Sequence, residues 1–96
     1  MNGSEIKAEI AERNEEALCI DGLDGERDGF NEALVGWGER CSLGPVAVYD
    51  VAKIISILES KYKMTHEEAY EWYDFNIAGA YMGEYTPIFI CDLRGI

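Results

Sequence analysis

The sequence predicts a small α+β domain, because helical and strand-like patterns follow one another along its 96 residues in the order α-β-β-α-α-β. Two runs rich in β-branched and aromatic residues, 33–41 and 45–49, are joined by a short turn, which favours an antiparallel hairpin. Two helical segments and a third apolar run, 87–91, complete the pattern. We therefore expect a small three-stranded, mainly antiparallel sheet with helices packed on one face.

The first helix is expected over residues 4–18, with Ser4 as its N-cap. Its apolar stripe rests mainly on Ile6 and Ile10, so this helix should pack weakly. The segment 21–29 contains three Asp and three Gly, a composition that predicts a loop.

The two later helices carry clearer signals at their first residues. Asp50 is expected to cap the second helix, whose apolar residues recur at helical spacing. Thr65 and Glu68 have the spacing of a capping box, which predicts that a third helix begins there and runs to about Ala78.

Acidic residues are distributed unevenly along the chain. Residues 1–32 contain ten acidic and three basic residues, whereas residues 33–96 contain nine acidic and five basic residues. We expect a single domain, 1–96, in which residues 1–32 form an acidic helix and loop attached as an appendage. Residues 33–96 would then form the compact core.

The formal net charge of −11 argues against direct binding of DNA, RNA or an anionic membrane, since their phosphates would be repelled. The sequence has no apolar run of about 18 residues and no apolar N-terminal segment of the secretory type. We therefore expect a cytoplasmic protein whose partner, if it has one, presents a basic surface.

Catalytic and metal-binding motifs are not found in the sequence. His66 is the only histidine, and the three cysteines form no CxxC pair. Asp24, Glu26 and Asp28 match part of a calcium loop, but Val35 stands where the bidentate glutamate would be needed. We therefore expect no enzymatic activity, no cofactor and no metal.

The remaining signal is an acidic surface that includes an aromatic side chain. Tyrosine is a favoured interface anchor, and Tyr70 falls on the acidic side of the third helix. The expected partner-binding residues are Glu9, Glu12, Glu16, Asp24, Glu26, Asp28, Glu67, Tyr70, Glu71 and Asp74.

Two stretches of the chain, GERC–PVAVYD (38–50) and FNIAGAYMGEYTPIF (75–89), carry a family resemblance. They resemble small acidic proteins of unknown function that are encoded by bacteriophages and prophages. In size and charge the chain is also similar to phage inhibitors of CRISPR interference. The resemblance covers about the last two thirds of the chain and implies a phage context, but it assigns no role to any residue.

Together these observations favour a non-enzymatic, phage-type binding protein. It would engage a host protein through its acidic and aromatic surface and inhibit or modulate it, with nucleic-acid charge mimicry as a more specific version. The alternative is a homo-oligomeric structural or virion accessory protein, because the apolar strands offer sheet edges for pairing.

Overall fold

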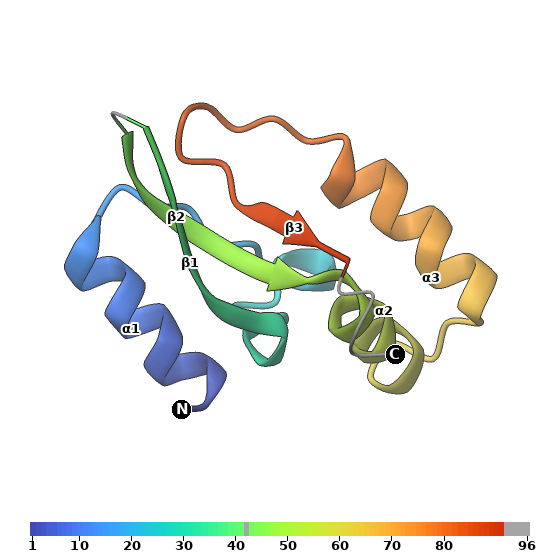
Figure 1. Cartoon of the computed structure of the whole chain (residues 1–96). Coiled ribbons are helices and arrows are strands. Elements are labelled where there is room, and N and C mark those ends of the chain that lie inside the picture. Colours follow the sequence, from blue (N-terminus) through green and yellow to red (C-terminus); the bar gives the residue numbers. More distant parts are fainter. Residues whose placement is uncertain (42, 92–96) are drawn as a thin grey trace.

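The computed structural model describes residues 1–41 and 43–91, and it confirms the α+β class (Figure 1). The helices are α1 (Gly3–Arg13), α2 (Val51–Ser60) and α3 (His66–Tyr73), and the strands are β1 (Leu34–Arg40), β2 (Leu43–Asp50) and β3 (Ile88–Ile90). Two short 3₁₀ turns, η1 (Leu23–Gly25) and η2 (Asn31–Ala33), precede β1, and a π-helical turn, η3 (Asp74–Ala78), extends α3. The element order agrees with the order expected from the sequence.

The sheet has the strand order β1-β2-β3 and is mixed. The β1–β2 hairpin is antiparallel, as predicted, but β3 pairs with β2 in parallel, with Val48 opposite Ile88. The expectation of a mainly antiparallel sheet is confirmed for the longer pair, β1–β2, while the shorter pair, β2–β3, makes the sheet mixed. Parallel neighbours need a crossover connection, and α2 with α3 provides it between β2 and β3 (Figure 1).

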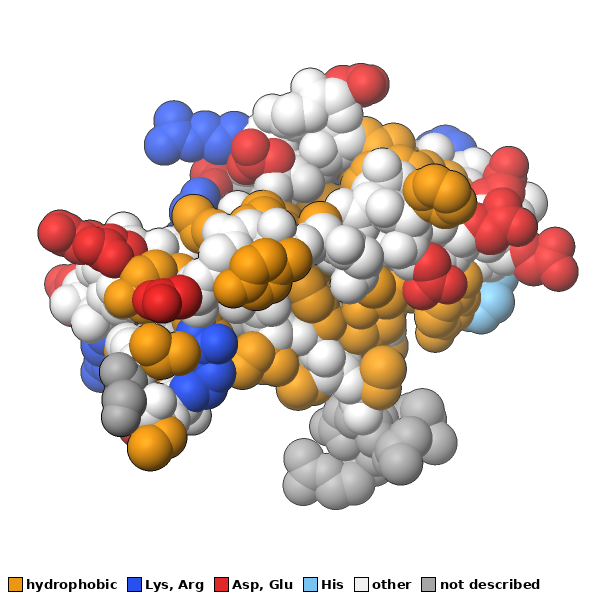
Figure 2. Space-filling model, turned by 90° about the horizontal axis from the view of Figure 1, so that it is seen from above, with side chains coloured by type: hydrophobic (Ala, Val, Ile, Leu, Met, Phe, Trp, Pro, Cys, Tyr) orange, Lys and Arg blue, Asp and Glu red, His pale blue; other side chains and the backbone are white. Residues whose placement is uncertain are grey.

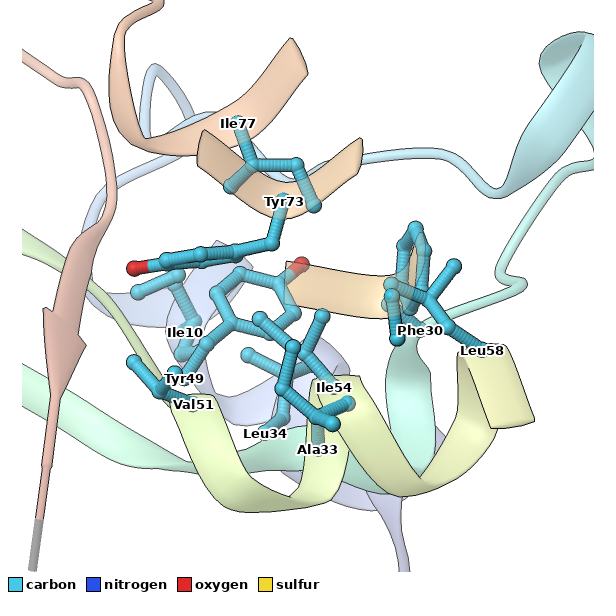
Figure 3. Close-up of a cluster of buried hydrophobic side chains, with 13 residues drawn as sticks. Ile10, Phe30, Ala33, Leu34, Tyr49, Val51, Ile54, Leu58, Tyr73 and Ile77 are labelled. Atoms are coloured by element: carbon cyan, nitrogen blue, oxygen red, sulfur yellow. The ribbon is translucent and has the colours of Figure 1, made fainter. Parts of the chain in front are cut away.

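The helices pack on one side of the sheet, which confirms the predicted arrangement. Ala47 and Tyr49 point to this side from β2 and share one apolar cluster with Ile10 of α1, Ile54 of α2 and Tyr73 of α3. Figure 3 shows side chains from these elements converging on one another.

The core also includes residues from the first third of the chain. Ile10 of α1 is 1% exposed and Phe30, directly before η2, is 0% exposed. In Figure 3 the ring of Phe30 lies beside Leu58 of α2. The expectation that the core is confined to residues 33–96 therefore needs correction, because residues 1–32 supply two of its buried side chains.

The N-terminal helix begins and ends earlier than the sequence suggests. Asn2, not Ser4, is the N-cap, and it forms a capping box with Glu5. The helix ends before Asn14, whose side-chain amide donates a hydrogen bond to the Pro45 carbonyl at 2.9 Å. At the other end, a Cβ added to Gly3 would come within 2.0 Å of the Asn31 carbonyl oxygen. Both ends of α1 are therefore in close contact with the rest of the domain.

Candidate functional site

The ten residues predicted to bind a partner fall in three separate places. Glu9, Glu12 and Glu16 lie on α1 or just after it, Asp24, Glu26 and Asp28 lie in the loop around η1, and Glu67, Tyr70, Glu71 and Asp74 lie on α3 or at the start of η3. Figure 1 shows α1 and α3 at opposite ends of the molecule. The structure therefore does not bring the ten residues together on one surface.

The α1 carboxylates are partly neutralised within the helix. The Glu9 carboxylate pairs with the Arg13 guanidinium one turn later. Arg13 in turn lies over the ring of Trp37 on β1, with its central carbon 3.9 Å from the ring centroid. Glu12 and Glu16 are exposed and form no ion pair within residues 1–41 and 43–91.

Two carboxylates of the loop are bound by cations from distant parts of the chain. Glu26 pairs with Lys61, whose Nζ lies 2.6 Å from Oε1, and accepts a hydrogen bond from the Tyr62 hydroxyl. Asp28 pairs with Lys7 of α1. These contacts hold the loop against α1 and the end of α2, and they compensate two of the four acidic side chains of residues 21–29.

The ion pairs shift the protonation of both carboxyl groups. The Lys61 ammonium beside Glu26, together with the Tyr62 hydroxyl, holds the pKa of the Glu26 carboxyl below its usual value of 4.5. Lys7 lowers the pKa of the Asp28 carboxyl in the same way. A carboxyl group whose pKa is lower in the folded protein stabilises the fold above its ordinary pKa, and this stabilisation is lost as the pH falls through the lowered value.

Replacing Glu26 with glutamine is therefore expected to lower the thermal midpoint of the protein at pH 7. The difference from the unmodified chain should shrink as the pH falls below 4.5 and vanish below the lowered pKa of Glu26. Calorimetry between pH 7 and pH 2.5 measures this difference. The control is Asp24→Asn, which changes charge equally at an exposed loop position with no ion pair in the described part of the chain. A Glu26 effect that is the same at every pH would contradict the prediction.

The four predicted residues near α3 form one exposed surface. Glu67, Tyr70, Glu71 and Asp74 recur at positions i, i+3, i+4 and i+7, so they share one face of the helix. All four are exposed, and no cation of the described residues pairs with their carboxylates. Figure 2 shows acidic side chains gathered at the right-hand end of the molecule, beside the histidine. We call these four residues the α3 acidic face.

Exposed aromatic side chains lie within this face and in the residues that follow it. Tyr70 is 40% exposed, and the His66 ring meets it edge-on with centroids 5.0 Å apart. Phe75 is 90% exposed, and Tyr81, in the segment after η3, is 80% exposed. Phe75 was not among the predicted partner-binding residues, although it follows Glu71 by four positions, the spacing of one helix face.

A shallow hollow lies beside the α3 acidic face. It has a volume of about 350 Å³ and is lined by Met64, Glu68, Glu71 and Trp72. Trp72 is half-buried and its ring packs against Phe30, with centroids 6.1 Å apart.

A second hollow of about 260 Å³ lies on another side of Trp72 and includes Cys19, Ile20 and Asp21 in its lining. Trp72 thus separates two hollows, each with at least one acidic residue in its wall.

Neither a metal-ligand cluster nor a membrane-spanning helix is found among the described residues. Nowhere in 1–41 and 43–91 do three or more His, Cys, Asp or Glu side chains gather closely enough to hold a metal ion. Every helix in these segments is too short or too polar to cross a bilayer. The His66 imidazole contacts the Glu59 carboxylate on the exposed surface, with Nδ1 3.0 Å from Oε2.

No family model, curated protein or solved structure matches the chain significantly. The surface of the molecule is therefore the basis for inferring its function.

Proposed function

We propose that this chain is a protein-binding domain without enzymatic activity, and that it engages a positively charged partner through the α3 acidic face. The observation that carries this proposal is the contrast between its carboxylates. Glu9, Glu26 and Asp28 are neutralised by cations of the chain, whereas Glu67, Glu71 and Asp74 form no ion pair with described residues. Glu12 and Glu16 near α1 are unpaired within the described part of the chain as well, but only the α3 carboxylates share a helix face with an exposed tyrosine, Tyr70. Uncompensated charge of one sign speeds association with an oppositely charged surface.

Aromatic anchors on the same surface support a protein partner. Interface energy is concentrated in a few residues, among which tyrosine and tryptophan are enriched. Tyr70 and Phe75 supply exposed rings beside the carboxylates. An acidic surface that lacked such rings would suit solubility alone.

The sequence resemblance to phage and prophage proteins gives this proposal its context. In that context the partner is a host protein in the cytoplasm, and binding inhibits or modulates it. A charge-mimic version adds that the carboxylates occupy a groove in which the partner binds nucleic acid. This version predicts that the chain competes with DNA or RNA for the groove, so that the partner binds less nucleic acid when the chain is added.

Self-assembly is the second candidate function, since β1 is an edge strand and exposes Val35 and Trp37. The register of β1 shifts twice, between Leu34 and Gly36 and between Gly38 and Arg40. Such irregularities twist an edge strand away from pairing with another chain. They therefore favour the binding of a basic partner over self-assembly. Light scattering across a wide range of concentration distinguishes the two, because a constant monomer mass excludes self-assembly.

Affinity capture from a bacterial host lysate tests the proposal with two matched variants. In the first, Glu67, Glu71 and Asp74 are replaced by Gln, Gln and Asn. In the second, Glu12, Glu15 and Glu16 near α1 are replaced by Gln, which removes the same charge at the other end of the molecule. We expect the unmodified chain and the α1 variant to recover one basic protein in stoichiometric amount, and the α3 variant to lose it.

The salt dependence of this complex provides a second test of the proposed function. Binding should weaken as the salt concentration rises, because exposed charges are screened over about 10 Å at 0.1 M salt. A partner retained by the α3 variant, or lost equally by both variants, would refute the α3 acidic face as the binding site.

A further inference from the structure

The hollow lined by Met64, Glu68, Glu71 and Trp72 combines two kinds of wall. Met64 and Trp72 supply apolar surface, while Glu68 and Glu71 supply carboxylates. One oxygen of Glu68 already accepts the Thr65 backbone N–H of the capping box at 2.8 Å, so Glu71 is the carboxylate that remains wholly open. No ion pair joins either carboxylate to a cation in residues 1–41 or 43–91.

The same chain shows what completes such an arrangement. On the opposite side of the domain, the Arg13 guanidinium lies over the Trp37 ring and pairs with the Glu9 carboxylate. That site therefore combines an indole ring with a guanidinium and with a glutamate one helical turn before the arginine. At Trp72 the ring and the carboxylates are present, and the described part of the chain supplies no cation.

The apolar wall and the open carboxylate of this hollow suit an arginine side chain better than a lysine side chain. An arginine guanidinium is planar, stacks on aromatic rings and binds carboxylates through two parallel N–H donors. A lysine ammonium is a compact and strongly hydrated point charge, which gains less from an apolar wall of Met64 and Trp72. The long apolar stem of either side chain can lie along such a wall, but only guanidinium offers a flat face to the ring.

We propose that the hollow lined by Met64, Glu68, Glu71 and Trp72 receives an arginine side chain of the basic partner. The guanidinium would lie against Trp72 and pair with Glu71. This inference rests on the proposed function and specifies the residue type that the α3 acidic face recognises.

Two synthetic peptides test this specificity on the full chain. Both have blocked ends and a Gly-Ser backbone of equal length, and they carry either four arginines or four lysines. The readout is the pair of tryptophan indole N–H signals in the ¹H–¹⁵N spectrum of labelled protein. The chain has two tryptophans, so a Trp37→Phe variant assigns both signals.

We expect the arginine peptide to shift the Trp72 signal in a saturable manner and to leave the Trp37 signal in place. Its Kd should be about fivefold lower than that of the lysine peptide, in line with a cation–π contact at an exposed site. Glu71→Gln should reduce this preference. Glu67→Gln removes the same charge from the α3 acidic face without lining the hollow, so it should weaken both peptides equally.

The arginine site would be overturned if the two peptides bound with equal affinity and if Glu67→Gln and Glu71→Gln weakened binding to the same extent. That result would still support the α3 acidic face as a binding surface. Binding of neither peptide would overturn both proposals. A preference for arginine that survives Glu71→Gln and leaves the Trp72 signal unmoved would place the guanidinium elsewhere and refute this hollow.

Discussion

Replacing Phe30 with alanine is expected to lower the free energy of unfolding by about 3–5 kcal/mol, the range for deletion of a buried aromatic ring. Phe30 is 0% exposed, and its ring packs against Tyr62 and Trp72 with centroids 6.4 and 6.1 Å away. The partial collapse expected around such a cavity does not recover these contacts. Urea denaturation with a shared m-value measures the change.

A matched control is available in Phe75, which is 90% exposed. Phe75→Ala removes the same side chain from the surface and should change the free energy of unfolding by at most about 0.5 kcal/mol. If Phe30→Ala were as mild as Phe75→Ala, the packing of residues 1–32 against the core would be wrong and the appendage interpretation would be restored.

Phe30 also connects the core to the proposed arginine hollow. Trp72 lines that hollow and rests on Phe30. Loss of the Phe30 ring should therefore weaken the preference for the arginine peptide in a variant that still folds. Phe75→Ala should leave this preference unchanged, because Phe75 does not line the hollow.

The elements that the sequence predicted well are those encoded by local chemistry. The Thr65–Glu68 capping box forms as expected, with Glu68 N–H bonded to Thr65 Oγ1 at 3.2 Å. Asp50 caps α2 by accepting from the Ala52 N–H. Each of these features depends on residues two or three positions apart, so no tertiary contact is needed to recognise it.

Features that the sequence did not reveal depend on contacts between distant residues. A thin apolar stripe made α1 look detachable, yet Gly3 allows its backbone to approach Asn31 closely and Ile10 is buried. The direction of β3 is likewise set by where α2 and α3 end, which periodicity does not encode. Phe30 lies at the end of a Gly- and Asp-rich stretch, whose composition conceals its burial.

The candidate site was predictable only in part, for the same reason. Helical spacing alone places Glu67, Tyr70 and Glu71 together. No local pattern reveals that Glu26 is neutralised by Lys61, which lies 35 positions later. The sequence therefore located the acidic residues, and the fold determined which of them remain uncompensated.

Tyr49 provides the second large expected effect. Its side chain is 0% exposed, its ring stacks on Phe89 at 5.7 Å, and its hydroxyl accepts a hydrogen bond from the Ile20 N–H at 3.0 Å. Burial, followed by the nearby Cys19, raises the pKa of this hydroxyl, which therefore stays neutral. Tyr49→Ala should lower the free energy of unfolding by about 3–5 kcal/mol, as for other buried aromatic residues.

Tyr49→Phe separates the hydroxyl from the ring, because phenylalanine preserves the packing on Phe89. The Ile20 N–H, whose hydrogen bond is part-buried, then loses its acceptor, so we expect a loss near the low end of the range of about 1–3 kcal/mol typical of unpaired buried donors. Tyr70→Phe removes an exposed hydroxyl and should be nearly neutral in the same denaturation experiment. Hydrogen exchange at Ile20 gives a local reading, since its amide should exchange faster in Tyr49→Phe. Unchanged exchange would show that Tyr49 acts through its ring alone, and that the chain between α1 and η1 is held to the sheet by other contacts.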